Sequence, residues 1–133
     1  MVNMNNGKKI LIVVEDDGML RKIMADKFKT FGYEVFQAED GQVAVDAILD
    51  KKPDLVLLDL LIPKVDGFLV LEKIRNYPDA KIAQTPVVVL SNLWSDKDIL
   101  RVKSLKIDDY FVKANTDMNQ FYEKVQALLA KAG

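Results

Sequence analysis

Five short apolar runs alternate along the chain with segments in which apolar residues recur every three or four positions. Short apolar runs bounded by turn residues are typical of strands. The first, third and fourth runs are apolar without interruption, as in central strands of a parallel sheet that are covered on both faces. The predicted strands are 10–14, 33–38, 55–58, 87–91 and 110–112.

The segments between these runs have the spacing of amphipathic helices. A first helix is predicted to end at Gly32, a second to follow Asp40 and a third to follow Gly67. Ser95, three residues before Asp98, resembles a capping box at the start of a fourth helix. The apolar residues of the last helix are Phe121, Val125, Leu128 and Leu129, with Thr116 or Asp117 as its cap.

Strands that alternate with helices indicate the α/β class, here a (βα)5 arrangement. Such a chain forms a doubly wound, five-stranded parallel sheet with right-handed crossovers. No linker or internal repeat interrupts the pattern, and 133 residues suit one domain with one buried core. We therefore expect a single domain over 1–133, with a flexible N-terminal tail at 1–7.

Composition excludes several classes of function. Lys and Arg total 19 and Asp and Glu total 20, for a net charge of −1, so no basic excess favours direct binding to nucleic acid or to a membrane surface. No apolar run approaches a membrane span, and the start lacks the apolar stretch of a signal peptide; we expect a cytoplasmic protein. Cysteine and histidine are both absent, which excludes disulfides, thiol chemistry and a histidine base.

Polar residues stand where four of the predicted strands end. In open parallel sheets, ligands bind beyond the carboxyl ends of the strands. The residues concerned are Glu15, Asp16 and Asp17 after the first strand, Asp59 after the third, Ser91 and Asn92 at the end of the fourth, and Lys113 after the fifth. Clustered carboxylates repel one another, and a hard divalent cation, Mg²⁺ or Mn²⁺, relieves that repulsion.

The remaining groups suit an anionic oxygen ligand. The hydroxyl of Ser91 and the ammonium of Lys113 both donate hydrogen bonds to anionic oxygens. Together with the acids and a metal, they suggest phosphoryl transfer onto a carboxylate. Each residue also has a simpler interpretation: Asp59 as a turn or helix cap, Asp17 as the cap of the first helix, Ser91 as an ordinary strand-end hydroxyl, and Lys113 as a surface lysine.

Four motifs resemble those of the response-regulator receiver domain, the phospho-accepting module of two-component signalling. They are "VEDD" after the first strand, "PDLVLLDLLIPKVDGF" around the third, "PVVVLS" at the fourth and "DYFVK" at the fifth. The resemblance extends from "KKILIVVEDD" to the last helix. It implies a flavodoxin-like fold with strand order 2-1-3-4-5, similar to single-domain chemotaxis regulators.

The resemblance also implies a role for each site residue. Asp59 would be the phosphoacceptor and a metal ligand, Asp16 a direct ligand, Glu15 a ligand through water, and the backbone carbonyl of Leu61 a further ligand. Ser91 and Lys113 would contact the phosphoryl group. Ser91 and Tyr110 would form the switch, which changes the surface of the fourth helix, fifth strand and fifth helix; packing alone is the other interpretation of Tyr110.

The implied partners are a histidine kinase or phosphotransfer protein as donor and an effector protein as output. The donor histidine must be on another protein because this chain has none. A homodimer that forms on phosphorylation is also expected, whereas direct contact with nucleic acid or membrane is not. The chain is either a stand-alone regulator or part of a larger protein, since nothing after 131 is long enough for an output domain.

Other functions are also compatible with the sequence. A receiver-like scaffold that is never phosphorylated is one, and a phosphatase with an aspartyl nucleophile is another. Against the phosphatase, Leu61 stands where such enzymes usually carry a second acid. A nucleotide- or flavin-binding protein is a third, but no glycine-rich phosphate loop is present.

Three departures from the family pattern concern the site. Ala114 follows Lys113 where the family usually has a cis proline, so either a trans bond aims Lys113 differently or a cis bond persists at a cost of about 2.5–4 kcal/mol. Asn92 replaces a small residue and either narrows access to Asp59 or contacts the phosphoryl group. Leu61 and Leu93 cannot orient an attacking water, so we expect a slowly hydrolysed acyl phosphate.

Trp94 is expected to be partly buried by the fourth helix or to share in a partner surface.

Overall fold

The computed structural model describes residues 7–93 and 95–131. Residues 1–6 of the expected tail and Trp94 lie outside the described residues, and Gly7 at the start of them is exposed. The strands are β1 (Ile10–Val14), β2 (Glu34–Ala38), β3 (Leu55–Leu58), β4 (Val87–Ser91) and β5 (Asp109–Val112). The helices are α1 (Gly18–Thr30), α2 (Gly41–Lys51), α3 (Gly67–Arg75), α4 (Ala80–Ala83), α5 (Asp96–Lys103) and α6 (Met118–Lys131), with a 3₁₀ turn η1 at Lys113–Asn115.

The predicted elements are all present, with small differences at their ends. Three strands have the predicted bounds, β2 begins one residue later, and β5 begins one residue earlier. The fourth and last predicted helices are α5 and α6. The sequence pattern missed α4 and η1 because four and three residues are too few to show a helical period.

The five strands form one parallel sheet in the order β2-β1-β3-β4-β5. This confirms the fold class and the strand order that the resemblance implied. The strands β1, β3 and β4 lie in the centre, and all but the first residue of β1 are buried. At the edges, β2 and β5 are mostly half-buried. Uninterrupted apolar sequence therefore marked the central strands, as expected for strands covered on both faces.

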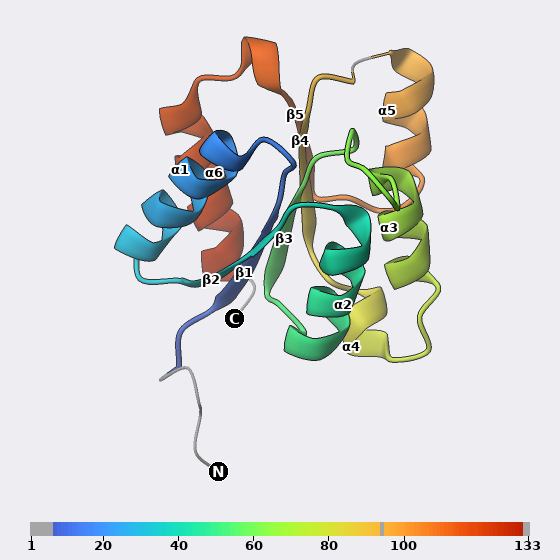
Figure 1. The fold of residues 1–133 in the computed structure, drawn as a ribbon, viewed down its shortest axis with the longest axis horizontal. Helices are drawn as coiled ribbons and strands as arrows, with labels where there is room; N and C mark the ends of the chain where they lie inside the picture. Colours follow the sequence, from blue (N-terminus) through green and yellow to red (C-terminus); the bar gives the residue numbers. More distant parts are fainter. Residues whose placement is uncertain (1–6, 94, 132–133) are drawn as a thin grey trace.

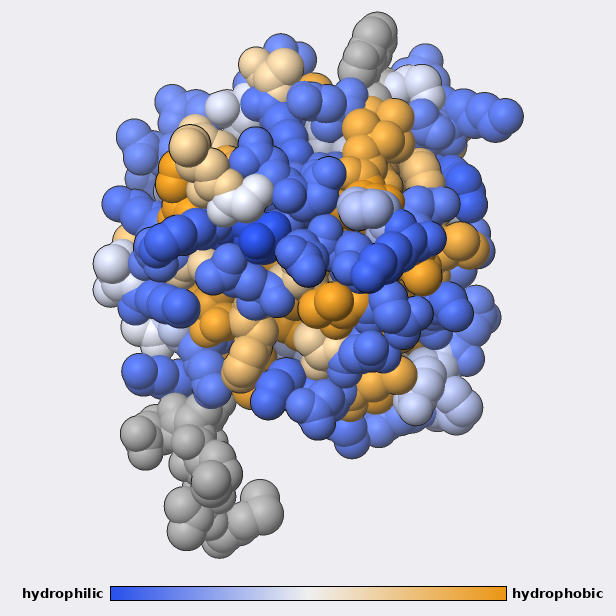
Figure 2. All heavy atoms as spheres, viewed as in Figure 1, coloured by the Kyte–Doolittle hydropathy of each residue, from blue (hydrophilic) through white to orange (hydrophobic). Residues whose placement is uncertain are grey.

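Helices cover both faces of the sheet (Figure 1). One apolar core lies under α1 and α6 and contains Leu11, Phe28 and Phe121. The other lies under α2, α3, α4 and α5 and is the larger of the two. Alternate residues of each central strand point into the two cores, as the two-residue period of a strand requires. Polar side chains cover most of the face seen in Figure 2, with apolar groups scattered between them.

None of the described helices is both long and apolar enough to cross a membrane.

Short polar side chains cap the N-termini of four helices, close to the helix starts that the sequence predicted. Asp17, Asp40, Asp66 and Ser95 accept hydrogen bonds from backbone N–H groups in the first turns of α1, α2, α3 and α5. Each satisfies a donor that a helix N-terminus leaves unpaired. Ser95 is confirmed as the cap of α5, since Asp98 N–H donates to Ser95 Oγ at 3.2 Å. The reciprocal contact differs from that of a capping box, because Asp98 Oδ2 accepts from the Ser95 hydroxyl, at 2.7 Å.

The loop between β3 and α3 is fastened to the start of α2. Gly41 N–H donates to the carbonyl of Pro63 at 3.2 Å, and Lys64 pairs with the buried Asp40 at 3.3 Å. Gly41 is required here because a Cβ would lie 1.6 Å from the carbonyl oxygen of Val65. The path of this loop, which begins at the carboxyl end of β3, is thus fixed by close packing against α2.

We expect Gly41→Ala to lower the free energy of unfolding by roughly 2–3 kcal/mol, because the added methyl group must displace backbone. Chemical denaturation of the parent and the variant measures the difference. Gly18→Ala is the control, since the added Cβ would lie 3.7 Å from its nearest neighbour, Arg21 Nη2, and alanine favours a helix. Equal stability of the Gly41→Ala variant and the parent would contradict the packing.

Candidate functional site

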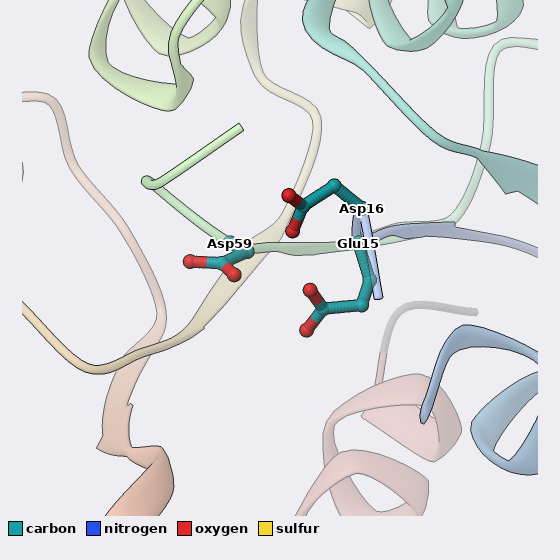
Figure 3. Close-up of side chains that lie close together, drawn as sticks. All are labelled: Glu15, Asp16 and Asp59. Carbon is teal, nitrogen blue, oxygen red and sulfur yellow. The ribbon is translucent and has the colours of Figure 1, made fainter. Parts of the chain in front are cut away.

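Three acidic side chains gather at the carboxyl ends of β1 and β3 (Figure 3). Glu15 and Asp16 follow β1, and Asp59 follows β3. The pairing of Val14 with Leu58 brings Glu15 and Asp59 level with each other across the two strands. One carboxylate oxygen from each of the three acids lies within 4.8 Å of the others. Glu15 and Asp59 are only 1% and 4% exposed, whereas Asp16 is exposed.

The ammonium of Lys113 lies between the two buried acids. Its Nζ is 2.5 Å from Glu15 Oε1 and 2.6 Å from Asp59 Oδ2. The bond between Lys113 and Ala114 is trans, like every other peptide bond in the described residues. Lys113 therefore reaches both carboxylates from a trans backbone at the start of η1.

The balance of burial and contacts with neighbouring charges raises the pKa values of both Glu15 and Lys113. Burial, reinforced by the charge of Asp59, raises the pKa of Glu15 to about 7, although the hydrogen bond from Lys113 opposes this. Burial by itself would lower the pKa of Lys113, but its hydrogen bonds to Asp59 and Glu15 outweigh burial and raise that pKa. Lys113 is thus held in its charged form, as a lysine between two carboxylates requires.

The position of Asp59 is set by its own backbone and by its neighbours. Its N–H donates to the carbonyl of Val14 at 3.0 Å. Its Oδ1 accepts from Leu61 N–H at 3.0 Å, while Oδ2 accepts from Lys113. Asp59 thus closes the turn after β3, but the cap of α3 is Asp66. A role of Asp59 as a turn cap therefore explains the contact of Oδ1 with Leu61 N–H. It does not explain the ion pair of Oδ2 with Lys113.

The residues at the end of β4 bond to the loops around them. Ser91 is completely buried, and its Oγ accepts from Leu93 N–H at 3.4 Å; among the described residues no hydrogen bond joins it to Asp59. Asn92 Oδ1 accepts from Ala114 N–H at 3.1 Å. The hydroxyl of Tyr110 donates to the carbonyl of Leu93. Burial, together with the charges of Asp98 and Asp59, raises the pKa of Tyr110.

The two apolar residues expected near the acids differ in their surroundings. Leu61 is 51% exposed and adjoins Asp59 through its N–H. Leu93 is half-buried and packs against the larger core. Of these two residues, it is therefore Leu61 that presents an apolar side chain to solvent beside the acids.

Arg21 also takes part in the site, although it was not among the predicted site residues. Its Nη1 donates to the carbonyl of Glu15 at 2.8 Å, and its Nε donates to Gln37 Oε1 at 3.2 Å. It thereby fixes the backbone at the acidic turn. The sequence did contain a signal for this role. Arg21 stands one helical turn after Asp17, in the helix that follows the acidic residues 15–17.

The donor set suits a hard metal ion. Glu15, Asp16 and Asp59 offer carboxylate oxygens alone, the ligand type that Mg²⁺ and Mn²⁺ prefer. Asp16 is exposed and open to solvent, which suits an ion that retains several waters. The acidic cluster can therefore hold a divalent cation.

Glu15→Gln is expected to gain stability relative to the parent as pH rises from about 5 to about 8. In the parent, the pKa of Glu15 rises from 4.5 to about 7 on folding. Between these values the unfolded chain has lost a proton that the folded protein keeps, so the free energy of unfolding falls as pH rises. The Glu15→Gln variant does not lose this part of its stability, because the side chain of glutamine does not titrate.

Urea denaturation at a series of pH values measures this difference, which should grow by roughly 2–3 kcal/mol across the range. Glu39→Gln, at an exposed acid, is the control. A Glu15→Gln difference that does not vary with pH would contradict the shifted pKa.

Comparison with known proteins agrees with this geometry. The family model of the response regulator receiver domain matches residues 11–126. The DNA-binding dual master transcriptional regulator RpaA of Synechocystis is 32% identical over 121 residues, which cover 91% of this chain and 49% of the relative. Regulator of RpoS from Escherichia coli is 36% identical over 123 residues, covering 92% of this chain and 35% of the relative. The chain thus spans a third to a half of these relatives.

Solved structures share the fold. The receiver domain of the Francisella response regulator 1452 superposes with a TM-score of 0.83 at 25% identity, covering 95% of this chain and all of that one. The Vibrio cholerae chemotaxis protein CheY4 superposes with a TM-score of 0.81 at 20% identity, covering 92% and 99%. With the matched family model, the strand order and the acids at the ends of β1 and β3, these findings show that the chain belongs to the response regulator receiver domains of two-component signalling.

Proposed function

We propose that the chain accepts a phosphoryl group on Asp59 from a histidine kinase or phosphotransfer protein. The observation that supports this most directly is the pairing of the buried Asp59 with Lys113 at 2.6 Å, beside two further acids. An ionised carboxylate at the end of a strand is a nucleophile that an incoming anion can approach only if positive charge is present. Lys113 provides part of that charge.

The transfer follows from the positions of these groups. An oxygen of Asp59 attacks the phosphorus of a phosphohistidine on the donor protein, the P–N bond breaks, and the departing imidazole takes up a proton. The product is an acyl phosphate on Asp59. Lys113, released from the carboxylate oxygen that has reacted, then pairs with a phosphoryl oxygen. The hydroxyl of Ser91 donates a hydrogen bond to another phosphoryl oxygen.

A divalent cation, Mg²⁺ or Mn²⁺, completes the proposed site. Asp16, Asp59 and the backbone carbonyl of Leu61 would hold it as ligands, and Glu15 would act through water. When bound, the ion neutralises negative charge on the transferring group. Asp16 would contribute its ligand oxygen from an exposed position, while Arg21 holds the backbone of the turn at Glu15.

The proposed output is a change in the surface formed by α5, β5 and α6. Ser91 and Tyr110 are the switch: as the hydroxyl of Ser91 moves toward the phosphoryl group, the loop that carries Leu93 moves, and Tyr110 gives up its hydrogen bond to the Leu93 carbonyl. Phosphorylation thereby shifts an existing equilibrium between two arrangements of this surface. An effector protein, or a second copy of the chain, binds the shifted form.

The proposal extends to the setting of the protein. Residues 1–133 act as one receiver domain in the cytoplasm. The receiver itself contacts proteins rather than nucleic acid or membrane, in keeping with its net charge of −1; the DNA binding stated in the name of the Synechocystis relative concerns a protein about twice as long. Two-component phosphotransfer is favoured over a phosphatase because Leu61 offers no second acid beside Asp59.

Intact mass after incubation with acetyl phosphate and Mg²⁺ tests the proposed chemistry. We expect the parent to gain one phosphoryl group and Asp59→Asn to gain none. Asp16→Asn should retain Asp59 but react at least tenfold more slowly, because an interaction with the metal is lost. A parent that fails both with acetyl phosphate and with a panel of phosphorylated histidine kinases would refute the proposal and favour a scaffold that is never phosphorylated.

The acyl phosphate is expected to be long-lived because the side chain of Leu61 cannot orient a water molecule. Leu61→Asn supplies an amide at the exposed position beside Asp59 and should shorten the half-life about threefold to tenfold, the effect of one hydrogen bond in the transition state. Loss of label from purified phosphoprotein measures the half-life, with Leu69→Asn, on α3, as the control. Rapid loss from the parent that Leu61→Asn leaves unchanged would contradict this.

A further inference from the structure

Asn92 joins the loops after β4 and β5 where the sheet itself has ended. The backbone ladder between these strands ends with Ser91 opposite Val112. Beyond it, the Asn92 side-chain oxygen accepts a hydrogen bond from Ala114 N–H at 3.1 Å. Because a backbone N–H can only donate, it must be the amide oxygen of Asn92 that faces Ala114. The contact extends the connection between β4 and β5 past the last paired residues.

Lys113 is the residue enclosed by this connection. On one side, Val112 is held by the ladder, and its carbonyl also accepts from Thr116 Oγ1 at 2.6 Å. On the other side, Ala114 is held by Asn92. A lysine side chain is long and flexible, so the backbone from which it starts decides whether its ammonium reaches Glu15 and Asp59. Fixing both neighbours fixes that starting point.

We propose that Asn92 is a positioning residue for Lys113. By holding the N–H of Ala114, it keeps the η1 turn in the path from which the ammonium of Lys113 bridges the two buried acids. The consequence for phosphoryl transfer rests on the proposed function, whereas the link between Asn92 and Lys113 does not. Since Asn92 directly follows Ser91, any displacement of Ser91 also acts on the backbone of Lys113.

Nuclear magnetic resonance of the unphosphorylated protein tests the link without any phosphoryl donor. Two signals are followed: hydrogen exchange at the Ala114 amide, and the ε-ammonium resonance of Lys113, assigned by its absence in Lys113→Arg. Asn92→Ala should speed Ala114 exchange and broaden the ammonium resonance, because bridged ammonium protons exchange slowly with water. Asn92→Asp keeps an acceptor oxygen and should preserve the slow exchange at Ala114.

Asn115→Ala is the matched control. It removes the same kind of side chain, but from η1 itself, and in the described part of the chain the Asn115 side chain makes no hydrogen bond. Both NMR signals should stay as in the parent. A shared effect of the two alanine variants would show that the turn responds to any substitution and would overturn the proposal.

Phosphorylation by acetyl phosphate with Mg²⁺ then measures the consequence. Asn92→Ala should lower the maximal rate about threefold to tenfold, the range expected for one hydrogen bond, with little change in the acetyl phosphate concentration that gives half the maximal rate. Slower phosphorylation with an unchanged Lys113 resonance would mean that Asn92 acts on the phosphoryl group itself, which overturns the proposal. An unchanged Lys113 resonance and rate would overturn it as well.

The two arms separate this inference from the proposed function. If the parent accepts no phosphoryl group and yet the Lys113 resonance depends on Asn92, the proposed function fails and the positioning role stands. If the parent is phosphorylated and the Lys113 resonance does not depend on Asn92, the positioning role fails alone.

Discussion

The ion pairs of Lys113 are the interaction on which the rest of the site depends. Two carboxylates that are almost completely buried, Glu15 and Asp59, lie close enough to repel each other, and a single ammonium contacts both. Removing one partner from a buried ion pair typically costs about 3–5 kcal/mol, because the other charge is left uncompensated. The chain can keep these acids at the end of its most buried strands only because β5 delivers a lysine to them.

That arrangement follows from the parallel sheet. Parallel strands end at one edge, so residues far apart in sequence meet there without any loop having to fold back. The pairing of β1 with β3 sets Glu15 level with Asp59, and β4 separates β3 from β5, across which the long side chain of Lys113 must reach. A lysine suits this distance because its four-carbon stem spans it, whereas the shorter carboxylates sit on adjacent strands.

The sequence predicted the features that depend on strand pattern and position. Apolar runs located the five strands, and the polar residues that follow them located Glu15, Asp16, Asp59 and Lys113. What it could not predict depends on the path of loops. The short α4 has no period to detect, the partner of Asn92 depends on where η1 turns, and the hydrogen bond of Tyr110 to Leu93 joins segments 17 residues apart. The strand order came from the likeness to a known family. The pattern of apolar residues along the chain would be the same for any order of the strands in the sheet.

The fastening of the β3–α3 loop to α2 gives the site an asymmetry. On one side, Gly41 N–H donates to the carbonyl of Pro63, and the carbonyl of Val65 lies so close to Gly41 that a methyl group has no room. On the other, the segments after β4 and β5 are joined by exposed, single hydrogen bonds such as that of Asn92. A backbone displacement at the acidic edge toward α2 would therefore meet close packing at Gly41. A displacement on the side of α5 would be opposed there by single hydrogen bonds, for which water can substitute.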